Sequence, residues 1–171
     1  MKTLYLFRHG KSSWDDSRLA DEERPVTPKG IKKTLFVSRY LREKGIRPGL
    51  IVSSHAKRAY ETAVTVAKEL DYPKEQIRVD RKIYDGYYDR ILDIIYATPN
   101  DVDSLMIFGH NPTITHLANL FLEPGIEELS TSAVVAISFN TDRWEGLPMS
   151  QANKEFHVYP KLLKNHEEEK K

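Results

Sequence analysis

Three short apolar segments, each followed by a polar junction and then a helical pattern, dominate the sequence up to about residue 120. They are residues 4–7 (LYLF), 50–52 (LIV) and 105–108 (LMIF). Each is short and apolar enough to be a strand buried on both faces of a sheet. Strands that alternate with helices favour a mostly parallel sheet. We therefore expect an α/β fold with three layers, in which helices cover both faces of the sheet.

The composition is that of a globular protein. The chain has 171 residues, of which 40% are hydrophobic and 30% charged, as expected for one ordinary domain. We predict a domain over residues 1–160, followed by a charged tail over residues 161–171 that frays. No segment looks like a signal peptide or a membrane span, so a cytoplasmic protein without a membrane partner is expected.

Charge and cysteine content exclude further classes. The formal net charge of +1 predicts no nucleic-acid partner, so anion binding has to come from a local cluster. The absence of cysteine excludes disulfides, thiolate metal sites and a cysteine nucleophile.

Individual residues and short segments predict where helices, loops and further strands lie. Thr27 before Pro28 predicts a helix start, and a second and third start are predicted at Ser53-Ser54 and at Asn111-Pro112. Residues 84–88 are expected to form a loop. Residues 133–139 and 155–159 are expected to form late strands at an antiparallel edge.

The three junctions carry unusual side chains. The first strand ends in Arg8 and His9, the second leads into a helix whose first turn holds Arg58, and the third ends in His110. If the strands are parallel neighbours, these side chains converge at the carboxyl edge of the sheet, where ligands bind in such folds. Arginine forks match phosphate oxygens, and a neutral imidazole can attack phosphorus. The pattern therefore predicts phosphoryl chemistry.

These residues lie in motifs that resemble the histidine phosphatase superfamily. The motifs are RHG at residues 8–10, SSxxxRAxxTA at residues 53–63 and GHNP at residues 109–112. KSSW at residues 11–14 and RPVT at residues 24–27 resemble its small SixA-type phosphohistidine phosphatase branch. The resemblance implies a phosphoglycerate mutase-like fold over a single histidine phosphatase domain.

The resemblance also implies roles for the predicted site. His9 would be the nucleophile that forms a phosphohistidine intermediate, and Arg8, Arg58 and His110 would hold the phosphoryl oxygens. No metal or other cofactor would be needed. The substrate would be a phosphorylated protein, with phosphohistidine first, or a small phosphomonoester.

The proton donor to the leaving group is less well marked. Asp85 is the candidate and Asp89 the next, although an aspartate before a glycine also suits a simple turn. Asp15 stands where the mutase branch has asparagine, and a carboxylate there argues against a mutase. His55 can line the pocket or cap a helix, and Trp14 can touch substrate or anchor its loop.

Two other functions fit part of the pattern. His9, His55, His110 and Asp85 could hold the metal of a metal-dependent hydrolase, although two arginines in the same crevice would repel it. A module that binds phosphate without turnover would need the same arginines but would form no phosphohistidine.

Overall fold

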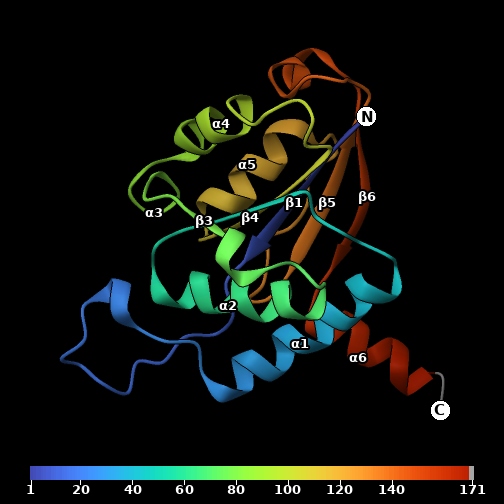
Figure 1. Cartoon of the computed structure of the whole chain (residues 1–171). Helices are drawn as coiled ribbons and strands as arrows, with labels where there is room; N and C mark the ends of the chain where they lie inside the picture. Colours follow the sequence, from blue (N-terminus) through green and yellow to red (C-terminus); the bar gives the residue numbers. More distant parts are fainter. Residues whose placement is uncertain (170–171) are drawn as a thin grey trace.

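A six-stranded sheet forms the centre of the protein, whose computed structural model describes residues 1–169 (Figure 1). The strand order is β3-β2-β4-β1-β5-β6. The strands are β1 (Lys2–Arg8), β2 (Leu50–Ser53), β3 (Arg78–Val79), β4 (Ser104–Gly109), β5 (Val134–Phe139) and β6 (Ala152–Val158). The four strands β1, β2, β3 and β4 run parallel to one another, and β5 runs antiparallel to both β1 and β6. The expected mostly parallel sheet and its antiparallel edge are confirmed.

Helices cover both faces of the sheet, as expected for a three-layer fold. One face packs against α1 (Pro28–Glu43), α2 (Lys57–Glu69) and α6 (Pro160–Glu169). The other packs against α4 (Tyr88–Tyr96), α5 (Thr113–Phe121) and the 3₁₀ turn Trp144–Met149, with the short α3 (Lys82–Asp85) at its edge. Figure 1 shows the two groups of helices on opposite sides of β1 and β4.

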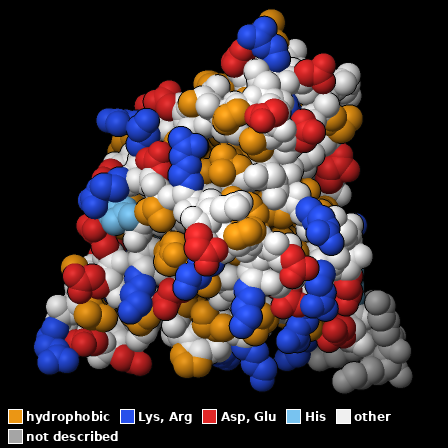
Figure 2. Space-filling view, in the orientation of Figure 1, with side chains coloured by type: hydrophobic (Ala, Val, Ile, Leu, Met, Phe, Trp, Pro, Cys, Tyr) orange, Lys and Arg blue, Asp and Glu red, His pale blue; other side chains and the backbone are white. Residues whose placement is uncertain are grey.

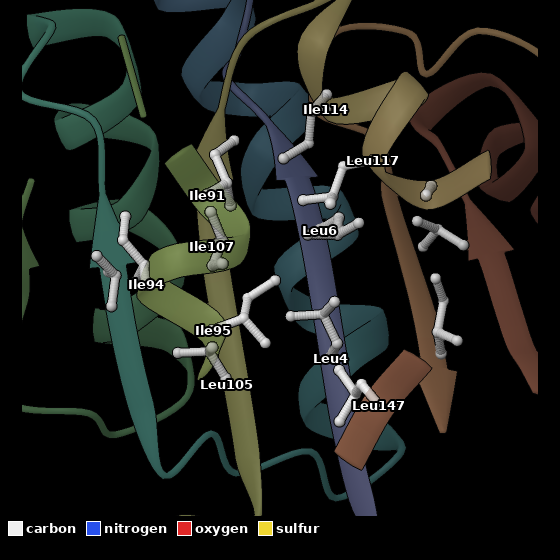
Figure 3. Packing of buried hydrophobic residues seen from close by; sticks show 14 of the residues in the cluster. Leu4, Leu6, Ile91, Ile94, Ile95, Leu105, Ile107, Ile114, Leu117 and Leu147 are labelled. Atoms are coloured by element: carbon white, nitrogen blue, oxygen red, sulfur yellow. The ribbon is translucent and has the colours of Figure 1, made fainter. Parts of the chain in front are cut away.

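Alternating side chains of the central strands supply two cores. In β1, Leu4 and Leu6 face α4 and α5, whereas Tyr5 and Phe7 face the α1 and α2 layer. Figure 3 shows Leu4 beside Ile95 of α4 and Leu6 beside Leu117 of α5. A strand buried on both sides has to be apolar at every position, which explains why its sequence is a run and not an alternation.

One of the three predicted helix starts has the expected cap. Thr27 Oγ1 accepts a hydrogen bond from the Gly30 backbone N–H at 2.9 Å, and Pro28 is the first residue of α1. α2 and α5 have no side-chain cap. Ser54 and Asn111 instead bond to the groups around the carboxyl edge of the sheet. The other two predicted caps are therefore wrong, because tertiary partners compete for these side chains.

Two segments are more ordered than expected. Residues 84–88 are not one loop, since α3 ends at Asp85 and α4 begins at Tyr88. The predicted fraying tail is also wrong up to Glu169, because Leu163 of α6 is buried against the α1 and α2 layer. A domain boundary at residue 160 stays a prediction, and Lys170 and Lys171 lie outside the described residues. Over residues 1–169, no helix has the length and apolar character needed to cross a membrane.

Gly30 provides a test of the packing at the start of α1. A Cβ at this position would lie 2.7 Å from the Lys11 carbonyl oxygen and 2.7 Å from Val26 Cγ1. Alanine normally stabilises a helix interior by about 1 kcal/mol relative to glycine. We expect Gly30→Ala instead to lower the free energy of unfolding by about 1–3 kcal/mol, because this contact overpacks the junction.

Urea denaturation of Gly30→Ala measures this loss. Arg39→Ala at an exposed position of the same helix is the control and should stay within about 0.5 kcal/mol of the parent. A Gly30→Ala protein as stable as the parent would contradict the close contact.

Candidate active site

The carboxyl ends of β1 and β4 bring two histidines together. The parallel register pairs Arg8 with Gly109, so His9 and His110 follow their strands at the same level. The His9 backbone N–H donates to the Gly109 carbonyl at 3.1 Å, and the two imidazole centroids lie 5.1 Å apart. β2 pairs with the other side of β4, so Arg58 in the first turn of α2 lies at the same edge of the sheet.

His9 is buried and held in one tautomer. Its Nδ1 lies 2.7 Å from the Gly10 carbonyl oxygen, which can only accept, so Nδ1 carries the proton of the neutral ring. The lone pair is then on Nε2. The Gly10 N–H donates to Thr62 Oγ1 of α2 at 2.9 Å, which fixes the turn that presents the ring.

His110 is oriented by Ser54. Its Nε2 lies 2.8 Å from Ser54 Oγ, which also accepts the Ala56 N–H at 3.1 Å. If the Ser54 hydroxyl donates to Nε2, the proton of the neutral ring lies on Nδ1. This Nδ1 is buried and has no hydrogen-bond partner among the described residues. In that tautomer it is a donor available to a ligand.

Both rings are neutral well below pH 7. Burial lowers the pKa of His9 to about 4, and the positive charges of Arg58, Arg8 and Arg24 act in the same direction, against the bond to Gly10. Burial also lowers the pKa of His110 to about 3, followed by the effects of His9 and Arg58. A neutral imidazole is the form that can donate a lone pair to an electrophile.

Arg8 is anchored from the loop before β5. Its guanidinium donates to the Leu129 carbonyl at 2.9 Å, and Asn111 Nδ2 donates to the same oxygen at 2.6 Å. Asn111, expected as a helix cap, thus ties this loop to the junction after β4. Arg8 Nε is buried without a partner among the described residues.

Arg58 is held by Asp21, a residue that the sequence did not single out. Its guanidinium donates to the Asp21 carbonyl at 2.7 Å and to the Asp21 carboxylate at 3.0 Å. The same carboxylate accepts from Arg24 Nε at 3.2 Å and from the Tyr84 hydroxyl at 2.6 Å. The bond from Tyr84, followed by Arg58, lowers the pKa of Asp21 to about 2 despite desolvation.

Tyr84 enters the cluster, whereas Asp85 does not. The Tyr84 ring lies edge-on to His110, with centroids 5.4 Å apart. The bond to Asp21 raises the pKa of Tyr84. Asp85, the expected acid, is exposed and pairs with Arg81 one turn earlier at 3.4 Å. Neighbouring residues of the short α3 point in different directions, and only the tyrosine reaches the histidines.

The remaining candidates from the sequence have structural partners. His55 Nε2 bonds to Glu22 at 2.8 Å. Trp14 does not anchor its loop in the core; its side chain is exposed and stacks on the buried Arg24 guanidinium, 3.5 Å from the ring centroid. Asp15 is exposed. No hydrophobic pattern in the sequence predicts that Asp21, Arg24 and Tyr84 belong to the site. Arg24 is, however, the first residue of the RPVT motif at residues 24–27.

A metal site was the main alternative. Among the side chains of residues 1–167, no group of three or more histidines, aspartates or glutamates is placed to hold a metal ion. Glu22 holds His55, and Asp85 lies with Arg81, so the four suggested ligands are not brought together as one set.

The cluster suits a small anion with several acceptor atoms. Arg8 Nε, Arg58 Nε and His110 Nδ1 are buried nitrogens without partners among the described residues. Such groups are costly unless they are satisfied. A phosphoryl group can accept from all three nitrogens, and the ring of His9 lies beside that of His110 with its lone pair on Nε2.

Comparison with known sequences identifies relatives. The model of the histidine phosphatase superfamily (branch 1) matches residues 4–89. An uncharacterised chloroplastic protein of Arabidopsis thaliana is 30% identical over 153 residues, which are 84% of this chain and 69% of that protein.

Comparison with solved structures shows the same fold elsewhere. The protein histidine phosphatase SixA, solved with tungstate, has a TM-score of 0.80 at 21% identity and covers 94% of this chain and 99% of its own. The mycobacterial glucosyl-3-phosphoglycerate phosphatase has a TM-score of 0.65 at 16% identity, with 91% and 97% covered. The expected SixA-like, phosphoglycerate mutase-like fold is confirmed.

The protonation of the two histidines can be tested by NMR. We expect ¹⁵N-labelled protein to show His9 as the Nδ1–H tautomer and both rings to stay neutral from pH 8 down to about pH 5, given pKa values of about 4 and about 3. The exposed His116 is the internal control for assigning the ring signals. A midpoint near 6.5 for His9 would contradict the buried arrangement.

Proposed function

Because the chain belongs to the histidine phosphatase superfamily, we propose that it is a metal-independent phosphatase that passes a phosphoryl group through His9 to water. We propose phosphohistidine on a protein as its substrate. The single observation that carries the mechanism is the bond from His9 Nδ1–H to the Gly10 carbonyl, which leaves the Nε2 lone pair available on a neutral ring.

The reaction has two displacements. In the first, His9 Nε2 forms a bond to phosphorus while the bond from phosphorus to the leaving nitrogen or oxygen breaks, and the electron pair stays on the leaving atom. In the second, a water oxygen attacks phosphorus, the bond to His9 breaks, and a proton of the water is lost to solvent. The Gly10 carbonyl stabilises the positive charge on the phosphorylated ring.

The arginines stabilise the phosphoryl oxygens. Asp21 fixes two nitrogens of Arg58, and Leu129 fixes one of Arg8, so both guanidiniums are oriented before substrate arrives. Donors that need no reorganisation are the most effective at a charged transition state. His110 Nδ1 is a further buried nitrogen of this cluster without a partner among the described residues.

The choice of substrate rests on the lack of a ready acid. Asp21 is ionised at neutral pH because its pKa is about 2, and the pKa of Tyr84 is raised. Asp85 lies with Arg81 outside the cluster. An alkoxide leaving group would need a proton from such a residue. The leaving imidazole of phosphohistidine protonates readily, which favours a phosphorus–nitrogen bond.

Replacement of His9 tests the covalent step. We expect His9→Asn to lower kcat/KM for an aryl phosphate by about 10³-fold or more. The parent protein, quenched during turnover, should carry an acid-labile phosphoryl group on His9. His116→Asn, at the exposed histidine of α5, is the matched control and should retain parent activity.

The same assay separates the alternatives. Turnover that survives in the His9→Asn variant would show that His9 is not the nucleophile. Loss of activity in chelator, with recovery in zinc or manganese, would support a metal-dependent hydrolase. Phosphate binding without turnover or adduct would indicate a binding module.

The dependence of kcat/KM on the leaving group tests whether a residue of the protein acts as the general acid. We expect kcat/KM to fall by about 10²-fold or more from aryl phosphates to alkyl phosphates, because no residue protonates the leaving oxygen. Asp85→Asn should change kcat/KM by less than about twofold for both classes. A selective loss of alkyl phosphate turnover in Asp85→Asn would restore the acid role predicted from the sequence.

A further inference from the structure

A basic groove lies between the first halves of α1 and α6 and has a volume of about 940 Å³. Its lining holds one carboxylate, Glu167 of α6, against five lysines, which are Lys29, Lys32 and Lys33 of α1 and Lys161 and Lys164 of α6. Phe36, Pro28 and Pro160 give it an apolar surface between the charges. In Figure 2, Lys and Arg side chains gather along the bottom of the molecule, where α1 lies in Figure 1.

This charge arrangement is unfavourable for the two helices themselves. Neither α1 nor α6 has an acidic residue in its first turn, where the helix dipole favours negative charge. The spacing of Lys29 to Lys33 and of Lys161 to Lys164 also places like charges on one face. Among residues 1–167, no carboxylate forms an ion pair with the three lysines of α1. The net charge of +1 does not explain this concentration.

The groove opens at the edge of the sheet that carries His9. Val134 of β5 pairs with Phe7 near the end of β1 and with Val158 at the end of β6. α6 therefore starts, at Pro160, on the same edge as the active site. α1 starts there too, because a Cβ on Gly30 would lie 2.7 Å from the carbonyl of Lys11, two residues after His9.

We propose that this groove docks an acidic segment of the protein that carries the phosphoryl group. The inference rests on the proposed function and adds the surface that recognises the substrate protein. Carboxylates of the segment face the five lysines, and its apolar side chains contact Phe36 and the two prolines. Complementary charge raises the encounter rate and fixes the orientation of the partner.

The groove fits a protein better than other polyanions. Nucleic-acid-binding domains carry a large excess of basic charge, whereas this chain is nearly neutral. A lipid surface is flat, whereas the lysines here line a groove between two helices. A protein segment can fill the groove while another part of the same molecule presents phosphohistidine to His9.

Two double variants with equal charge change test the proposal. Lys29→Glu/Lys161→Glu reverses two charges in the groove. Lys68→Glu/Lys74→Glu reverses two exposed charges at the end of α2 and beyond, on the opposite edge of the sheet. The probes are a glutamate-rich peptide with one chemically phosphorylated histidine and the same peptide with glutamine for each glutamate. An aryl phosphate reports the chemistry alone.

We expect the parent and the control variant to hydrolyse the acidic phosphopeptide with a kcat/KM about tenfold higher than that for the neutral phosphopeptide. This preference should become smaller in about 0.3 M salt, which screens the charges. The groove variant should lose this preference but keep parent activity on the aryl phosphate. A preference that survives in the groove variant, or that is lost equally in the control variant, would overturn the docking proposal.

Binding of the unphosphorylated, fluorescently labelled peptides separates the two proposals. If the parent hydrolyses neither peptide nor aryl phosphate, the proposed function fails. The Kd for the acidic peptide still tests the docking proposal. The proposal requires that the groove variant binds this peptide more weakly than the parent and that the control variant binds it as the parent does. Tighter groove-dependent binding of a single-stranded oligonucleotide or of anionic vesicles than of the acidic peptide would overturn the choice of a protein partner.

Discussion

The parallel pairing of β1 with β4 is the constraint on which the site depends. Both strands are buried on two faces, so a slip of register would disrupt the packing of every side chain in both cores. The register that satisfies both cores pairs Arg8 with Gly109 and ends the two strands together. The rings of His9 and His110 then lie 5.1 Å apart without any direct bond between them. Core packing, and not polar attraction, brings these two groups into contact distance.

Charge compensation then decides which groups are available for chemistry. Three guanidiniums around a buried ring would repel one another, and the Asp21 carboxylate lies between two of them, Arg58 and Arg24. Asp21 balances part of the positive charge and also orients Arg58. Burial, together with the positive charge that remains uncompensated, lowers the pKa of His9 and keeps it neutral. The same edge of the sheet continues into the lysines of α1 and α6, so the positive potential extends beyond the cluster around His9 and His110.

Much of the fold and the centre of the site could be predicted from residue order. Apolar runs of strand length, separated by helical patterns, lead to a parallel sheet, and parallel strands have to end at one edge. Arg8, His9, Arg58 and His110 follow directly from that geometry and from the family motifs. Helix caps were predicted less well. Ser54 and Asn111 had the right residue types, but groups distant in sequence were better hydrogen-bond partners.

The sequence by itself therefore determined the sheet, its carboxyl edge and the four side chains that project from it, because hydrophobic periodicity is a local property. Only the tertiary structure decided that Asp21 holds Arg58 and that Tyr84, not Asp85, faces His110. The loop that carries Asp21 has no periodic pattern, and its contacts join residues far apart in the chain. Likewise, charge suggested a frayed tail after residue 160, whereas burial of Leu163 fixes it as a helix beside α1.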